Sequence, residues 1–161
     1  MVDAGSTPEW WDSAKQAISA SDTLLNDVIE EFEEPSLRSR GDLFATLIKS
    51  IVGQQISVVA ASAIWSRFED FVGQVTPESI LAKPHQEIKE VGLSNRKVEY
   101  IAGISQAWID GFGKIDWDEM SDEEVIEELV KLRGVGRWTV QMLLIFALLR
   151  PDVFPIDDIG L

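Results

Sequence analysis

Cysteine is absent from this chain of 161 residues, and so are long apolar runs. Without a thiol the chain has no disulfide, no thiolate nucleophile and no cysteine-held zinc or iron–sulfur cluster. The longest apolar run, residues 140–149, includes Gln141 and is too short to span a bilayer, so we expect a buried helix there. Residues 1–11 are polar and acidic and lack the apolar stretch of a signal peptide. We therefore predict a cytoplasmic protein with no membrane partner.

Basic residues are scarce, because 14 lysines and arginines stand against 28 aspartates and glutamates. The net charge of −14 argues against a polyanionic partner. The acidic excess is confined to residues 1–34 and 101–130, each with nine acids and one base. Residues 35–100 have seven acids and eight bases, and residues 131–161 have three acids and four bases. A polyanion can dock on these two segments, and we expect such binding to be weak, salt-sensitive and dependent on backbone N–H groups.

No segment alternates polar and apolar residues with a period of two, whereas apolar residues recur every three to four positions along most of the chain. We therefore predict an all-α bundle of about nine or ten short helices, with enough apolar residues for one core. Hydroxyl and aspartate caps mark most of the helix starts. The expected helices cover residues 8–20, 22 to the acidic run 30–34, 43–53, 57–71, a short stretch from 76, 84–92, 94–109, 123–131 and 140–149.

Residues 132–139, Leu-Arg-Gly-Val-Gly-Arg-Trp-Thr, lie between two of these helical patterns. The Gly-Val-Gly sequence is therefore a tight turn that joins two helices, and its glycines permit a positive φ and a close approach to another surface. Backbone N–H groups at the start of the second helix are then placed to bind an anion, most naturally a phosphate. Arg133 and Arg137 flank the turn and are placed to reach neighbouring phosphates.

This segment resembles the helix-hairpin-helix element of the HhH-GPD superfamily of DNA glycosylases. The family pattern is L-x-G-V/I-G-x-W/K-T, then an apolar helix, then an aspartate. Residues 51–57, Ile-Val-Gly-Gln-Gln-Ile-Ser, resemble a second signature, found in the 3-methyladenine DNA glycosylase II group. The resemblance covers residues from about 43 to the C-terminus. The matching hairpin and aspartate positions are Leu132, Gly134, Val135, Gly136, Trp138, Thr139 and Asp158.

The resemblance implies a monofunctional hydrolase that acts on double-stranded DNA with a damaged base. It removes alkylated purines, of the 3-methyladenine and 7-methylguanine type, after rotating the nucleotide out of the duplex, and so starts base excision repair. Lyase relatives carry a lysine where Trp138 stands, so no strand cleavage is expected. Asp158 is implied as the catalytic residue, and Trp138, Met142 and Asp157 as the substrate pocket. The implied DNA contacts are Gln54, Gln55 (as the wedge that fills the gap), Ser57, the exposed Arg96 and Lys97, Arg133, Gly134, Val135, Gly136, Arg137 and Thr139.

An indole and one carboxylate suit this chemistry. A base alkylated at N3 or N7 is positively charged, and a desolvated indole face attracts a cation by about 1–2 kcal/mol. The same charge weakens the glycosidic bond, so a single carboxylate that faces the developing oxocarbenium ion and orients water is sufficient. The pair of carboxylates that most sugar hydrolases use is not required.

Each residue assignment has a plainer structural alternative. In the structural interpretation, Asp157 and Asp158 are a common N-cap and first-turn acid, and Gln54 and Gln55 form a polar loop before a helix. In the same interpretation, Arg96 and Lys97 are ordinary surface bases that make no DNA contact. His85, the single histidine, receives no catalytic role. Two alternatives to the whole assignment stay open: a non-catalytic hairpin module that binds DNA, and a glycosylase of the same fold that removes a different damaged base.

The resemblance also carries expectations about organisation. We expect one domain, in which residues 36–130 form a helical lobe, residues 121–149 the hairpin, and residues 1–35 helices that pack against a C-terminal part. Relatives continue in further helices past the aspartate, so we expect this sequence to be C-terminally truncated. No cofactor is expected for catalysis, but a structural Na⁺ or K⁺ is expected at the carbonyls of Val130, Leu132 and Val135. The protein is expected to act as a monomer. If it is bacterial or archaeal, it is expected to be associated with the nucleoid.

Overall fold

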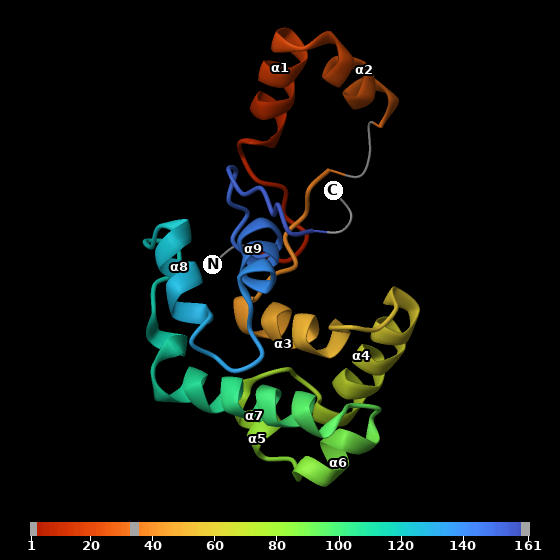
Figure 1. The fold of residues 1–161 in the computed structure, drawn as a ribbon, viewed down its shortest axis with the longest axis vertical. Helices are drawn as coiled ribbons and strands as arrows, with labels where there is room; N and C mark the ends of the chain where they lie inside the picture. The colour runs from red at the N-terminus through yellow and green to blue at the C-terminus, as the bar shows by residue number, and fades with distance from the viewer. Residues whose placement is uncertain (1–2, 33–35, 159–161) are drawn as a thin grey trace.

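The computed structural model of the chain describes residues 3–32 and 36–158. These residues form nine α-helices and one 3-10 turn and contain no strand, which confirms the all-α prediction (Figure 1). None of the described helices has the length and apolar character needed to cross a membrane. The elements are α1 (Trp11–Ser21), α2 (Thr23–Glu31), α3 (Leu43–Gly53), α4 (Val58–Val72), α5 (Pro77–Leu81), α6 (His85–Glu90), α7 (Asn95–Asp110), η1 (Phe112–Lys114), α8 (Asp122–Leu129) and α9 (Arg137–Phe146).

The core lies around α3, the most apolar helix of the chain. This helix packs against α4, α7 and α9, and α8 packs against α9. Its apolar residues return every three or four positions, so that Leu47, Ile48 and Ile51 are fully buried. Leu143 and Leu144 of α9 are fully buried in the same cluster. The arrangement places the C-terminal end of α3 beside the turn between α8 and α9.

Helices α1 and α2 pack on each other and project away from the rest of the fold (Figure 1). Neither helix contains a buried residue. The segment before α1 is attached to the core region at its base, where the Trp10 indole N–H donates to the Leu149 carbonyl at 3.0 Å. Apolar side chains stay exposed on the pair, with Leu24 at 75% and Phe32 at 67%. The expectation that residues 1–35 pack against a further C-terminal part stays a prediction.

Most helix starts follow their predicted caps. The side chains of Asp22, Asp42, Ser57, Thr76, Ser94 and Ser121 all accept a backbone N–H of the first turn of the next helix. The predicted start at residue 8 is wrong: α1 begins at Trp11, because the Ser6 hydroxyl donates to the Asp3 carbonyl and caps no helix. Helix α9 begins at Arg137, three residues before the predicted start. The end of the acidic run, residues 33–34, lies outside the described residues.

Candidate nucleic-acid interface and active site

The hairpin consists of α8, a turn over residues 130–136, and α9. Gly134 in this turn has a φ of +90°, the left-handed region that favours glycine. A Cβ atom at this position would lie 2.2 Å from Cδ2 of Tyr100 on α7, so glycine is also required for the turn to approach the ring. The expected positive φ and close approach are therefore both present, and the surface that the turn approaches is the protein's own α7.

Gly136 plays a different part in the same turn. It is the N-cap residue of α9, with an extended φ of −104°, and it supplies no side-chain acceptor to the first turn of the helix. A Cβ atom built on Gly136 meets nothing within 4 Å. The first N–H groups of a helix have no partner within the helix, so the start of α9 presents donors to an external anion. The local geometry thus agrees with a phosphate contact, which stays a prediction.

The loop between α3 and α4 lies against this hairpin. The side-chain amide of Gln54 donates to the Gly134 carbonyl at 3.0 Å, which connects the two signatures directly. The next residue, Gln55, is exposed and has a φ of +59°, a conformation that costs a non-glycine residue about 1–2 kcal/mol. Ser57 then caps α4 by accepting the Ala60 N–H at 3.3 Å. Gln54 therefore holds the loop in place, and Gln55 is presented at its tip.

A cleft of about 750 Å³ opens between this loop and the start of α9. Its aromatic walls are Trp138 of α9 and Trp65 of α4, and its charged residues are Arg40 and Lys49. None of the described residues that line the cleft is a carboxylate, whereas three other surface hollows each include at least one aspartate. The lining residues therefore give this cleft a net positive charge, which attracts an anion. Its lining comprises Arg40, Lys49, Ser50, Gly53, Gln54, Gln55, Ile56, Val58, Ala61, Ser62, Trp65, Trp138 and Thr139.

The two cations of the cleft were not singled out by any motif. The guanidinium of Arg40 lies 4.0 Å from the centre of the Phe146 ring, and the Lys49 ammonium lies 5.4 Å from the centre of the Trp65 ring. Among the described residues, neither cation has a carboxylate oxygen within 4.0 Å. Both belong to the segment 35–100, which is not acidic, and this charge distribution is the one sequence signal that pointed to them.

A carboxylate lies beside the indole of Trp138. The indole N–H donates to Oδ2 of Asp158 at 2.9 Å, although twenty positions separate the two residues in the sequence. The Asp158 side chain is half-buried, and its backbone N–H donates to the Pro155 carbonyl at 2.9 Å, which fixes the local turn. Trp138 is 41% exposed, so one part of the ring stays open to the cleft while its N–H holds the acid.

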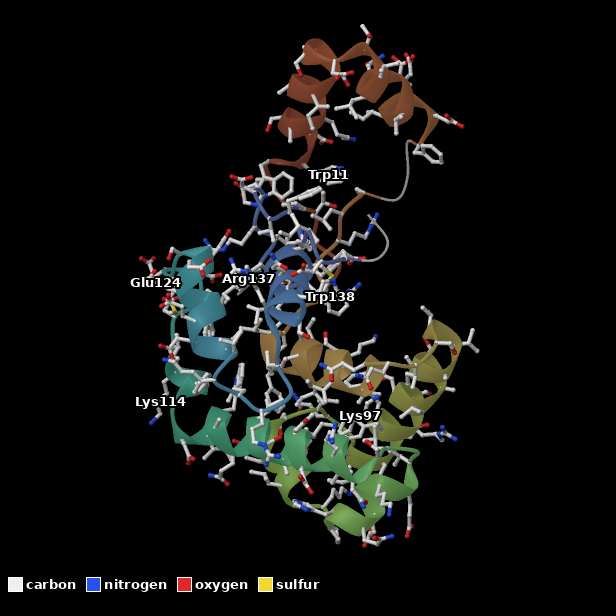
Figure 2. The ribbon with its side chains drawn as sticks, in the orientation of Figure 1. Trp11, Lys97, Lys114, Glu124, Arg137 and Trp138 are labelled. Carbon is white, nitrogen blue, oxygen red and sulfur yellow. The ribbon has the colours of Figure 1, made fainter. Side chains whose placement is uncertain are left out.

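Arg137 and Trp138 point to different sides of α9 (Figure 2). Its guanidinium donates to both carboxylate oxygens of Glu123 on α8, at 2.9 and 2.8 Å. The hydrogen bond from Arg137 lowers the pKa of Glu123, and the same bond, with smaller contributions from the charges of Glu123 and Asp157, raises the pKa of Arg137. The pair is exposed to solvent, so it is weak and open to exchange for a phosphate.

The other predicted residues differ in how they lie relative to the cleft. Met142 is half-buried on α9 and Asp157 is exposed, and neither lines the cleft, so their predicted contact with a substrate stays a prediction. Arg133 is exposed and lies 5.9 Å from the centre of the Tyr100 ring. Thr139 lines the cleft but is 4% exposed, and Val135 is 7% exposed, which limits direct contact by their side chains.

The predicted exposure of Lys97 is wrong. The ammonium of Lys97 turns inward and donates to the carbonyls of Val52 and Gln54, at 2.7 and 2.8 Å. The reason is that the C-terminal carbonyls of α3 lack partners within the helix and attract a cation. Arg96, its neighbour, is exposed as expected. Among the three carbonyls of the expected monovalent cation site, that of Leu132 accepts the Val135 N–H at 3.1 Å, within the turn.

Comparison with known proteins agrees with this arrangement. Residues 48–161 match the family model described as the HhH-GPD superfamily base excision DNA repair protein. The chain is 40% identical over 123 residues to DNA-3-methyladenine glycosylase 1 of Schizosaccharomyces pombe, which covers 73% of this chain and 54% of that protein. It is 35% identical over 131 residues to DNA-3-methyladenine glycosylase of Saccharomyces cerevisiae, which covers 74% of this chain and 44% of that protein. The chain thus spans about half the length of these relatives.

The fold is also similar to a solved structure. The 3-methyladenine DNA glycosylase of Schizosaccharomyces pombe, in complex with abasic DNA, superimposes with a TM-score of 0.79 and 32% sequence identity. The similarity covers 92% of this chain and 76% of that one. The family match includes the loop before α4, the hairpin and the aspartate that meets its indole. This chain belongs to the HhH-GPD superfamily of base excision DNA repair proteins.

Proposed function

We propose that the protein is a monofunctional DNA glycosylase, which hydrolyses the N-glycosidic bond of alkylated purines in double-stranded DNA. One observation carries the proposal: the Trp138 indole that lines the cleft donates to the Asp158 carboxylate at 2.9 Å. A stacking surface and an acid are thereby held together at the edge of a cleft with net positive lining. The names of the relatives, DNA-3-methyladenine glycosylases, support the alkylated purine as the substrate class.

The first task is to extract a base from a stacked duplex. Rotating a nucleotide outward costs a few kcal/mol, so the enzyme must hold the flanking backbone and fill the gap. The N–H groups at the start of α9 bind a phosphate on one side, since Gly136 gives them no side-chain cap. Arg40 and Lys49 add positive charge within the cleft. Gln55, exposed at the tip of its loop, enters the space that the base leaves.

The second task is to stabilise the sugar as the base departs. The extruded base stacks on Trp138, whose electron-rich face favours a purine made cationic by alkylation. The hydrogen bond from the indole to Asp158 fixes the direction of the carboxylate. That anion faces the developing oxocarbenium ion and orients the attacking water. Because Trp138 stands where a lyase carries its lysine, and Thr139 beside it is no amine, no imine forms and the strand stays intact.

A monovalent cation remains part of the proposal as a structural element. The backbone carbonyls of Val130, Leu132 and Val135 are the groups that would hold Na⁺ or K⁺ in the hairpin turn. Oxygen donors suit such ions, and a bound cation would reduce the repulsion between these carbonyls and an approaching phosphate. Catalysis as proposed takes no step through this ion.

Base release from methylated DNA tests the proposal. Full-length protein is incubated with methylated and with unmethylated duplex, and the free bases are separated by chromatography. We expect 3-methyladenine and 7-methylguanine from the methylated duplex, abasic sites in the product, and no strand breaks before alkali treatment. Binding without release of any base would support a non-catalytic DNA-binding module instead. Release of a different damaged base would identify a glycosylase of the same fold with another substrate.

A further inference from the structure

Lys97 connects the first turn of α7 with the end of α3. Its ammonium donates to the Val52 carbonyl, in the last turn of α3, and to the Gln54 carbonyl just beyond it, at 2.7 and 2.8 Å. The side chain is partly buried, and this burial lowers its pKa. Lys97 is thus held by two carbonyls, one in the last turn of α3 and one in the loop that precedes α4, and its side chain is only partly exposed.

The residue that follows these two acceptors is Gln55. With a φ of +59°, Gln55 is in the left-handed region, which a non-glycine residue occupies only when its surroundings hold it there. The carbonyl of Gln54 belongs to the peptide unit that joins Gln54 to Gln55, so the contact from Lys97 restrains the rotation of that unit directly. The strained tip of the loop is therefore determined in part by α7.

The opposite side of the same loop is attached to the hairpin. The Gln54 side chain donates to the carbonyl of Gly134 at 3.0 Å. The loop is thus restrained from both sides, by an ammonium from α7 and by the turn that approaches Tyr100 of α7. Two segments that are 80 residues apart in the sequence are thus joined by a hydrogen bond, and each of them also contacts α7.

We propose that Lys97 is a positioning residue, which holds the Gln55 loop ready for insertion into the duplex and does not itself contact phosphate. This inference rests on the proposed function, since it explains how the wedge is presented. Loss of the ammonium leaves two carbonyls without a donor and frees the Gln54–Gln55 peptide unit. Base extrusion then becomes less favourable, while the electrostatic contacts to the backbone of undamaged DNA are retained.

The test compares Lys97→Met, Lys97→Arg and Lys114→Met in the full-length protein. Lys97→Met keeps the aliphatic stem, Lys97→Arg keeps a charged group that donates hydrogen bonds, and Lys114→Met removes one exposed lysine beyond the other end of α7 (Figure 2). Thermal unfolding verifies that each variant is folded. Hydrogen–deuterium exchange of residues 52–58 reports the loop, and the fluorescence of 2-aminopurine beside an alkylated base reports extrusion. Affinity for undamaged duplex is measured across a salt series.

We expect faster exchange in residues 52–58 and about tenfold less extrusion for Lys97→Met, with at least partial recovery in Lys97→Arg and no change in Lys114→Met. The slope of log affinity against log salt is expected to be the same for Lys97→Met and the wild type, because no phosphate contact is lost. A slope lower by about 1 would identify a phosphate ligand and overturn the inference. Unchanged exchange and extrusion in Lys97→Met would also overturn it. A wild-type protein that releases no base would instead refute the proposed function.

Discussion

The substitution Gly134→Ala tests the packing on which the hairpin depends. An alanine at this position must keep a φ of +90°, which costs about 1–2 kcal/mol for an L-residue. Its Cβ would also lie 2.2 Å from one carbon of the Tyr100 ring and 2.6 Å from two others, so the ring or the turn must move. Overpacking of this kind costs about 1–3 kcal/mol. We expect a loss of about 2–5 kcal/mol in unfolding free energy, on the order of 10 °C in Tm.

Gly136→Ala is the matched control, two residues away in the same turn. Its φ is −104° and its added Cβ meets nothing within 4 Å, so the only expected cost is that of alanine at an N-cap, about 1 kcal/mol or less in unfolding free energy. Both variants are compared by urea unfolding followed by circular dichroism. Combining Gly134→Ala with Tyr100→Ala is expected to cost less than the sum of the two single changes, because the clash is removed. Equal stability of the two alanine variants would refute the packing argument.

Four further predictions concern charge and the indole. Glu123→Gln removes the acid that holds Arg137, so we expect tighter DNA binding with a salt slope larger by about 1, measured by titration at several salt concentrations. Acid titration of the wild type should show Glu123 ionised at lower pH than a free glutamate, since its pKa is lowered, and NMR of the carboxyl carbon measures this. Lys49→Met is expected to weaken binding of undamaged duplex and to lower the salt slope by about 1; an unchanged slope would contradict a role of Lys49 in phosphate binding. Trp138→Phe keeps an aromatic face but removes the N–H donor to Asp158, so we expect base release to slow by about tenfold with binding of abasic DNA retained.

Local signals in the sequence were sufficient to predict that the helices exist and where most of them begin. A cap such as Ser121 acts on N–H groups only a few residues away, and the periodicity of α3 directly describes which side is buried. The start of α1 failed because Ser6 has a competing acceptor nearby, in the Asp3 carbonyl. The start of α9 was predicted too late because Arg137 and Trp138 are polar or exposed, so the apolar pattern begins after the helix does.

Such local patterns do not predict contacts between residues that are far apart in the sequence. The family resemblance pointed to Trp138 and Asp158 together, and their hydrogen bond agrees with that pairing. No spacing indicates that Lys97 turns inward, because its acceptors lie 45 and 43 residues earlier. The same is true of the Gln54–Gly134 bond, which spans 80 residues. A lysine that faces solvent and a lysine that turns inward look alike in a sequence, and only the packing distinguishes them.

The most direct test of the proposed chemistry is the single-turnover rate of Asp158→Asn on a duplex with one alkylated purine. Asparagine fits the same space and still accepts from the Trp138 indole, but it carries no charge to face the oxocarbenium ion. We predict a fall in base release of about a hundredfold or more, with affinity for abasic duplex within about threefold of the wild type. A variant that releases the base at the wild-type rate would contradict the assignment of Asp158 as the catalytic residue.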